Sequence, residues 1–310
     1  MSWLGRINYP TEHQNNKVFK SEFYRKNMTM KNQIKTTLLL GALTGIFLLI
    51  GSFWGQGGLL IAIIFAGGMN FVSYWWSSKI VLWMYRAKEA DKKQYGHLYS
   101  MIKDIAKHAE IPMPKVYIVN TPQANAFATG RNPTNAVVAV TTGILQVLND
   151  KELKGVLAHE LGHVKNRDIL ISSIAAMIAG VISYIAMVAR WSAIFGGFGS
   201  DRERGNNLIG FVVLAILAPL MAMIIQLAIS RSREYLADET GARIVKDGKP
   251  LARALEKIHH STKSHPLHFG AEAGSSLFIE NPFKANALFN LFSTHPPVNK
   301  RVERLNSMKF

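Results

Sequence analysis

Long stretches without any charged side chain alternate with charged segments along this chain. Residues 36–78, 169–189 and 208–230 contain no Asp, Glu, Lys or Arg. A helix of about 20 residues crosses a hydrocarbon core about 30 Å thick, so the first stretch is long enough for two such helices. The glycine-rich segment Gly55–Gly58 is typical of a turn and divides that stretch. The pattern therefore predicts four transmembrane helices, two before residue 86 and two between residues 169 and 230.

The segments outside these apolar stretches have the periodicities of a folded domain. Apolar residues recur at helical spacing over residues 88–109. Short runs rich in β-branched residues predict strands at 116–119 and 136–141, and residues 123–128 are expected to be extended. Further helices are expected at 231–245, at 250–260 and from Pro296 onward. The predicted fold is therefore mostly α with a small β-sheet.

One more helix is predicted directly before the third apolar stretch. Asn149 or Asp150 is a suitable N-cap for it, and Glu152 is placed to support its first turn. This helix ends in the polar residues 165–168 and leads straight into the stretch that begins at Ile169. Its polar residues therefore lie close to a predicted membrane surface.

Basic residues flank the predicted transmembrane helices on one side only. They lie before residue 36, after residue 85, before residue 169 and after residue 230. The Gly55–Gly58 turn has none, and in the loop 190–207 two arginines are balanced by two acidic residues. Cytoplasmic loops carry such an excess of Lys and Arg, so both termini and the middle segment are expected in the cytoplasm.

The chain is thus expected to be a multi-pass cell-membrane protein whose net charge of +16 reflects its orientation in the lipid bilayer. No nucleic-acid-binding motif accompanies the charge, so nucleic acid is not expected as a partner. The absence of cysteine excludes disulfides and thiolate metal sites. The expected parts are a cytoplasmic segment 1–35, two helices in 36–85, a cytoplasmic part 86–168, two helices in 169–230 and a cytoplasmic part 231–310.

The helix before the third apolar stretch carries the pattern H-E-x-x-H, as His159-Glu160-Leu161-Gly162-His163. Residues four apart share a face of a helix, so both imidazoles can bind one metal ion, for which zinc is typical. Glu160 borders the same site, where its carboxylate can take a proton from water activated by the metal. The alternative is a surface helix with two ordinary histidines.

A catalytic zinc site usually has a third protein ligand. A histidine six residues after His163 is excluded, since that position is Ile169. Glu234 and Asp238, four residues apart, offer carboxylates on one helical face, of which Glu234 can bind the metal while Asp238 holds a ligand histidine by its other nitrogen. The alternative is that both are solvated charges, paired with Arg231 or Arg233. His259, His260, His265 and His268 are interpreted as surface histidines that bind metal only incidentally.

Three motifs together resemble the HtpX membrane metallopeptidases, a family grouped with the CAAX prenyl proteases and the Oma-type proteases. They are V-L-A-H-E-L-G-H-V-K-N-R-D at 156–168, S-R-E-Y-L-A-D at 232–238 and T-H-P-P at 294–297. The resemblance implies four transmembrane helices with a cytoplasmic zincin-like domain and one Zn²⁺ per chain. It implies zinc ligands at His159, His163 and Glu234, with Glu160 as general base and Asp238 orienting a ligand.

The resemblance also implies functional residues that spacing alone does not indicate. Asn125, Ala126 and Phe127 would form a strand edge that binds substrate, although without the family they are an ordinary hairpin strand. His295 would donate a hydrogen bond to the oxyanion formed during peptide hydrolysis. Arg301 would fix a loop or the substrate backbone.

The expected function is a membrane-anchored zinc endopeptidase that hydrolyses misfolded or damaged membrane proteins. One alternative is a CAAX-type protease acting on prenylated proteins, for which four transmembrane helices are few. A second is a non-catalytic scaffold in which zinc only holds helices together, although such a site needs no base like Glu160. The sequence names neither the substrate nor the oligomeric state.

Overall fold

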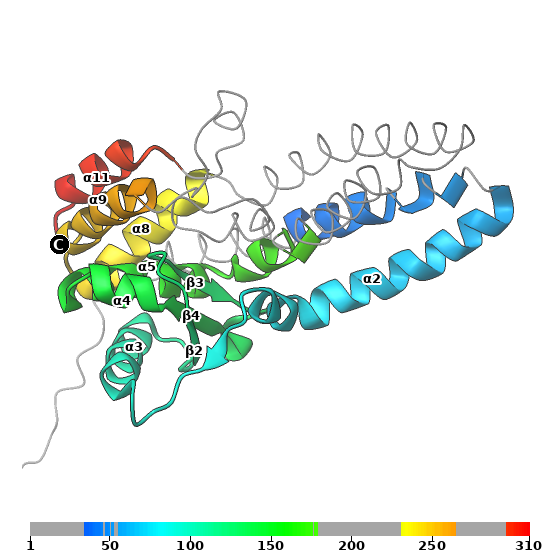
Figure 1. Cartoon of the computed structure of the whole chain (residues 1–310). Coiled ribbons are helices and arrows are strands. Elements are labelled where there is room, and N and C mark those ends of the chain that lie inside the picture. Colours follow the sequence, from blue (N-terminus) through cyan, green and yellow to red (C-terminus); the bar gives the residue numbers. More distant parts are fainter. Residues whose placement is uncertain are drawn as a thin grey trace, which may run out of the picture.

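The computed structural model describes residues 34–45, 47–49, 51–52, 55–175, 177–178, 231–264 and 296–310. Within these residues the fold is mostly helical, with a small mixed sheet of four strands, as the sequence predicts. Figure 1 shows the sheet and the shorter helices gathered at one end, with the long helix α2 extending away from them.

Helix α2 (Gly55–Met84) has 30 residues, which rise about 45 Å along its axis. Among the described residues it is the one helix long and apolar enough to cross a membrane. A shorter apolar helix covers Ile34–Leu49. The fourth predicted transmembrane helix lies outside the described residues, and of the third only its beginning, within 169–178, is described and helical.

The turn predicted at Gly55–Gly58 is confirmed only at its first residue. The second apolar helix begins at Gly55, so residues 56–58 are helical, and Gly55 alone among them has the positive φ (67°) of a turn residue. The helix ends at Met84. Val81 and Leu82 are buried against the sheet, so packing on the folded domain extends the helix beyond the length that lipid requires.

The strands lie in the order β1-β2-β4-β3. The central strands β2 (Lys115–Val119) and β4 (Val137–Thr141) are parallel, while β1 (Lys88–Glu89) and β3 (Ala126–Thr129) pair with them antiparallel. Both strand predictions and the extended segment are confirmed to within a few residues. The strand β3 therefore forms an edge of the sheet.

Both faces of the sheet are buried, because the two sides pack against different helices. Val116, Ile118, Val138 and Val140 belong to the main core, which includes residues of α3 (Gly96–Ala109) and α5 (Asp150–Asn166). On the other face, Phe127 and Ala139 form a separate cluster with the end of α2. The predicted helix from residue 88 begins only at Gly96, because Lys88 and Glu89 pair with β2 instead.

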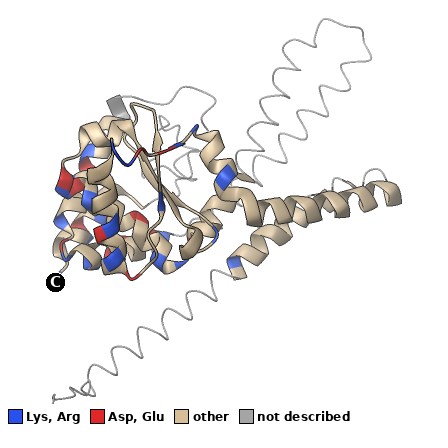
Figure 2. Ribbon diagram, turned by 90° about the horizontal axis from the view of Figure 1, so that it is seen from below, with Lys and Arg blue, Asp and Glu red and all other residues tan. Residues whose placement is uncertain are grey.

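The remaining helices cover the side of α5 away from the sheet (Figure 1). They are α8 (Arg231–Val245), α9 (Lys249–Ser264) and α11 (Val298–Ser307). The short α4 (Thr142–Val147) directly follows β4 and contacts β4 and α9, and a 3-10 turn, η1 (Pro133–Asn135), precedes β4. The helix predicted at 231–245 is confirmed. In the ribbon of Figure 2, Lys, Arg, Asp and Glu residues are concentrated at this end of the molecule, whereas α2 is almost free of them.

Candidate metal centre

The sequence fixes where α5 begins, and hence where its histidines point. The Asn149 side chain accepts a hydrogen bond from the Glu152 N–H at 3.0 Å, and the Glu152 carboxylate accepts one from the Asn149 N–H at 3.1 Å. This reciprocal arrangement satisfies two amides at the helix start. Of the two predicted caps, Asn149 is confirmed. The helix then continues unbroken through His159 and His163, which lie on the same face.

Glycines allow α8 to lie directly against α5. A Cβ on Gly241 would lie 2.7 Å from the main-chain nitrogen of His159, and one on Gly162 would lie 3.0 Å from the main-chain oxygen of Ala237. Side chains at these two positions would therefore push the helices apart. The close approach brings Glu234 of α8 within reach of both histidines of α5.

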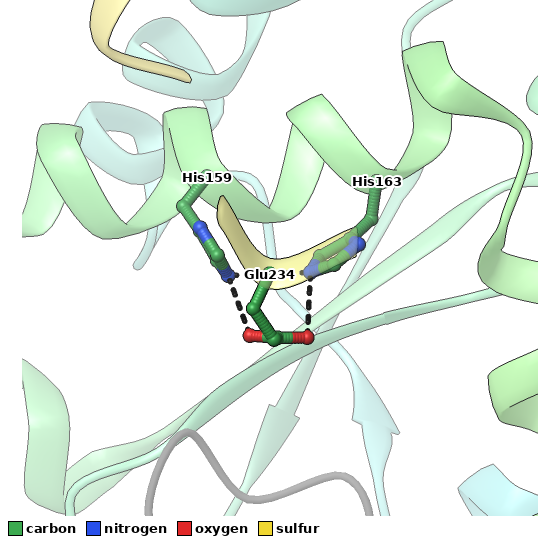
Figure 3. Close-up of side chains that lie close together, drawn as sticks. All are labelled: His159, His163 and Glu234. Atoms are coloured by element: carbon green, nitrogen blue, oxygen red, sulfur yellow. Dashed lines mark hydrogen bonds and ion pairs between the residues drawn. The ribbon is translucent and has the colours of Figure 1, made fainter. Parts of the chain in front are cut away.

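Figure 3 shows His159, His163 and Glu234 converging on one point. The two histidine Nε2 atoms are 3.2 Å apart, and they lie 3.7 Å and 3.6 Å from the Glu234 carboxylate oxygens. His159 and Glu234 are buried, and His163 is half-buried. The structure thus brings together the three residues that were expected to bind a metal.

The contacts of the other ring nitrogens show that these residues fit a cation. The His159 Nδ1 lies 2.9 Å from an Asp238 oxygen, and the His163 Nδ1 lies 3.0 Å from an Asp168 oxygen. An ionised carboxylate only accepts hydrogen bonds, so each Nδ1 carries the proton and each Nε2 of a neutral ring has a lone pair. Two lone pairs and a carboxylate facing each other repel unless a cation lies between them, and this donor set is one that zinc prefers.

Asp168 was not identified as a site residue from the sequence. It follows α5, where Arg167 adopts the left-handed conformation (φ 57°) and turns the chain back toward the helix. Both Asp168 oxygens lie within 3.1 Å of the His163 Nδ1, and Asp168 is only 1% exposed. The available signal was an acidic residue five positions after a ligand histidine, but its direction depends on the backbone of Arg167.

Asp238 and Arg301 form a buried ion pair behind His159. The Arg301 Nε and Nη2 donate to the two Asp238 oxygens at 2.9 Å and 2.7 Å, and Arg301 is 1% exposed. Burial raises the pKa of Asp238, but Arg301 and His159 outweigh it and lower the pKa to about 2. Since Glu234 and Asp238 are both buried, the alternative that they are solvated surface charges is wrong.

Arg301 was expected to contact a loop or the substrate, and that role remains a prediction. In the described residues the contacts of its guanidinium are to the metal centre: Nη1 lies 3.7 Å from a Glu234 oxygen, and Nη2 lies 3.5 Å from the His159 Nε2. The guanidinium therefore adds positive charge beside two carboxylates and fixes the position of Asp238.

The charges of the centre are arranged to attract a cation. Burial lowers the pKa of His163, but the carboxylates of Asp168, Glu234 and Glu160 outweigh burial and raise this pKa to about 10. Arg233 is also buried, beside Asp168 and Glu234, and burial lowers the pKa of its guanidinium. The carboxylates around His163 therefore outweigh the effect of burial and favour positive charge at this site.

Glu160 joins the metal centre to the edge of the sheet. Its Oε2 accepts a hydrogen bond from the Ala128 N–H of β3 at 3.0 Å. Burial raises the pKa of the Glu160 carboxyl above its ordinary value, although the two histidines act in the opposite direction. A carboxylate with a raised pKa binds a proton more readily, as a general base requires.

The segment expected to bind substrate lies beside Glu160. The Thr141 N–H donates to the Asn125 oxygen at 3.0 Å, so the main chain of Asn125 points toward β4. Because antiparallel strands alternate, the main-chain groups of Ala126 and Ala128 point to the outer edge. The side chain of Phe127 packs against Tyr85, with ring centroids 4.8 Å apart. His295, His265 and His268 lie outside the described residues.

Comparison with known proteins places the chain in a family of peptidases. Residues 92–309 match the model of Peptidase family M48. A Protease HtpX homolog of Syntrophobacter fumaroxidans is 50% identical over 282 residues, which cover 90% of this chain and 100% of the relative. Another, of Persephonella marina, is 53% identical over 279 residues, covering 89% of this chain and 96% of the relative.

Among solved structures, Ste24p of S. mikatae aligns with 90% of this chain and 67% of its own, with 18% identity and a TM-score of 0.49. The sequence relatives decide the assignment, since they match nearly the whole chain at about half identity. The chain belongs to peptidase family M48 and is a homologue of the HtpX proteases.

Proposed function

We propose that the chain is a zinc-dependent endopeptidase anchored in the cell membrane. The observation that carries the proposal is the convergence of His159, His163 and Glu234, with Glu160 beside them on an edge strand. A site that only holds helices together has no need of an additional buried carboxylate next to the edge strand of a sheet.

His159, His163 and Glu234 would hold one Zn²⁺ per chain. Bound there, zinc supplies a Lewis acid that polarises a peptide carbonyl and lowers the pKa of water. Asp238 and Asp168 keep the proton of each imidazole on Nδ1, so that both Nε2 atoms remain ligands. Arg301 keeps the Asp238 carboxylate charged and in place.

Glu160 would act as the general base. Its carboxylate takes a proton from the attacking water and passes it to the nitrogen of the leaving amine. Its raised pKa suits both steps, since the group must accept the proton and then release it. The hydrogen bond from Ala128 keeps the carboxylate beside the strand on which a substrate would lie.

An extended peptide would bind along β3. The outward main-chain groups of Ala126 and the carbonyl of Ala128 would offer hydrogen bonds to another strand, while the Ala128 N–H donates to Glu160. This kind of pairing makes little demand on side chains. Asn125 and Phe127 fix the strand from behind through β4 and Tyr85. His295 would stabilise the oxyanion, and Arg301 would secure the loop or backbone near it.

The location of the site suggests unfolded or damaged membrane proteins as substrates. Only Arg167 and Asp168 separate α5 from the apolar stretch 169–189, and the end of α2 packs against one face of the sheet. We place four helices in the bilayer, within 36–85 and 169–230, and the parts 1–35, 86–168 and 231–310 in the cytoplasm. Loops and ends of membrane proteins would then meet the site at the cytoplasmic surface.

The test is Glu160→Gln in the full-length protein, purified in detergent without chelators. We expect the variant to bind zinc as the unmodified chain does, while its hydrolysis of an unfolded protein such as casein falls about 10²- to 10⁴-fold. The exposed Glu256→Gln serves as a matched control and should retain full activity. Cleavage that survives both Glu160→Gln and chelator would refute the proposal, and a chain that holds zinc but never cleaves would be a scaffold.

A further inference from the structure

The turn that joins α5 to the third apolar stretch contacts both halves of the proposed active site. We call residues 167–173 the linking turn. Arg167 reverses the direction of the chain. The Ser172 N–H then donates to the main-chain oxygen of Asp168 at 3.4 Å, so the next helix begins directly after Asp168. Asp168 and Ser173 are five residues apart on this turn and are both almost fully buried.

At one end of the linking turn, Asp168 holds a proposed metal ligand. Its two oxygens lie 3.1 Å and 3.0 Å from the His163 Nδ1. The buried guanidinium of Arg233 stands near it, and its Nε and Nη1 donate no hydrogen bond within the described part of the chain. Arg233 therefore acts on Asp168 through its charge, while the Asp168 carboxylate itself accepts the hydrogen bond from the His163 Nδ1–H.

At the other end of the linking turn, Ser173 holds the proposed substrate strand. Its hydroxyl donates to the Ile169 oxygen at 2.7 Å, and its Oγ accepts from the Gly130 N–H at 3.3 Å. The Thr129 hydroxyl lies 2.7 Å from the same oxygen and donates to it, because the serine proton is already used. Thr129 and Gly130 are the end of β3 and the residue that follows, so the strand is tied to the turn.

The linking turn is also anchored in the apolar helices. Ile171 of the turn, and Ile174 directly after it, pack in one buried cluster with Leu39 and Leu43 of the helix Ile34–Leu49. Residues 169–173 are helical, and the Asp168 main-chain oxygen accepts from the Ser172 N–H, so residues 168–173 form one hydrogen-bonded segment. Displacement of the third apolar helix would therefore move Asp168 and Ser173 together.

We propose that Asp168 and Ser173 are positioning residues which keep the metal ligand His163 and the substrate strand β3 in a fixed relation. Asp168 sets the ring orientation and basicity of His163, while Ser173 sets the position of β3 relative to Glu160. The inference rests on the proposed function, since it assigns a metal to His163 and a substrate to β3.

The two residues should affect different quantities. Asp168→Asn keeps an oxygen that can accept from the His163 Nδ1 but removes the charge, so zinc affinity should fall about 10- to 100-fold. Ser173→Ala leaves the Gly130 N–H and the Thr129 hydroxyl without their acceptor, which loosens β3. We expect Ser173→Ala to raise KM several-fold with zinc affinity unchanged.

The experiment measures zinc affinity by competition with a chromogenic chelator, and kcat and KM on a peptide, for the full chain in detergent. Asp150→Asn, an exposed acid, and Ser172→Ala, the neighbouring serine, are matched controls and should behave as the unmodified chain. Asp168→Glu provides a second variant, which restores the charge one methylene farther out and should bind zinc at least several-fold more tightly than Asp168→Asn.

Equal zinc affinity in the unmodified chain and Asp168→Asn would overturn the inference for Asp168, as would equal affinities of the Asn and Glu variants. A KM unchanged by Ser173→Ala would overturn it for Ser173. If the unmodified chain itself binds no zinc and cleaves nothing, the proposed function fails instead, so the two failures are distinguishable.

Discussion

The two histidines of the metal centre are supported by carboxylates from different segments of the chain. His159 is backed by Asp238 on α8 and then by Arg301 on α11, which makes two hydrogen bonds to that carboxylate. His163 is backed by Asp168, only five residues later, at the start of the third apolar stretch. The first support joins distant segments of the folded domain, and the second lies next to the proposed membrane surface.

The hydrogen bonds around His159 and His163 differ, and this difference suggests that the two supports have different roles. On the His159 side, Nε and Nη2 of Arg301 each donate a hydrogen bond to the Asp238 carboxylate, which forms a buried ion pair. On the His163 side, Arg233 lies near Asp168 but its Nε and Nη1 donate no hydrogen bond within the described residues. We therefore expect the His159 side to determine stability and the His163 side to respond to movement of the apolar helices.

The largest effect is expected where the His159 support is broken. Arg301→Met leaves the buried Asp238 carboxylate without its guanidinium, which should cost about 3–5 kcal/mol of stability. The exposed Arg304→Met, one turn along α11, should cost less than about 1 kcal/mol, because its ion pair with Glu239 is exposed. Thermal unfolding of both variants measures the difference, and equal stabilities would contradict the comparison.

The next effect concerns the close approach of α5 and α8, on which both supports depend. Gly241→Ala places a Cβ 2.7 Å from the main-chain nitrogen of His159. It should therefore push α5 and α8 apart, destabilise the chain by about 1–3 kcal/mol and weaken zinc binding. Gly162→Ala should be milder, with its nearest atom at 3.0 Å. Gly96→Ala, with no atom within 4 Å, is the control. The prediction is wrong if Gly241→Ala binds zinc as tightly as Gly96→Ala.

A smaller, pH-dependent effect is expected at the start of α5. Burial raises the pKa of Glu152, but Lys257 and the Asn149 amide outweigh it and lower this pKa below 4.5. Its contribution to stability is therefore present above pH 4.5 and lost as the pH falls below that value. Glu152→Gln should cost about 1 kcal/mol at pH 7 and show a weaker loss of stability on acidification.

The control for that prediction is the exposed Glu256→Gln, compared by thermal unfolding between pH 7 and pH 3. If Glu152→Gln and the unmodified chain lose the same amount of stability over that range, the Glu152 carboxylate makes no pH-dependent contribution to stability.

The smallest effect is expected where the folded domain meets α2. The Arg131 guanidinium lies 4.2 Å from the ring centroid of Trp75, and such a contact contributes about 0.5–1 kcal/mol at an exposed site. Arg131→Gln should lower the stability by this amount and leave zinc binding unchanged. Lys92→Gln, whose Nζ is 5.9 Å from the Tyr99 ring, should have a smaller effect still. A loss of zinc in Arg131→Gln would show that this contact belongs to the metal centre.

The sequence predicts the parts of the site that depend on local periodicity. The helical spacing of His159 and His163 and the cap at Asn149 follow from residues within one helix, and the structure agrees. Spacing also placed Glu234 and Asp238 on one face of α8, but left open whether that face was buried. Only the fold decides this, because it depends on where α8 packs.

Other features could not be predicted because they depend on backbone geometry or distant contacts. Asp168 reaches His163 only through the left-handed conformation of Arg167, and a periodic pattern carries no such information. The extra turns of α2 depend on its packing against the sheet, and the role of Gly241 depends on the approach of a helix about 80 residues earlier in the chain. The resemblance to a family indicated Arg301, but its burial behind Asp238 is a tertiary feature.

The central claim is that one zinc ion is bound by His159, His163 and Glu234. Its most direct test is the zinc content and zinc affinity of the full-length chain, purified without chelators, beside Glu234→Gln and Glu256→Gln. We expect one zinc per chain in the unmodified protein and in Glu256→Gln, and loss of tight binding in Glu234→Gln. A chain that carries no zinc, or a Glu234→Gln variant that binds it as tightly as before, would contradict the account.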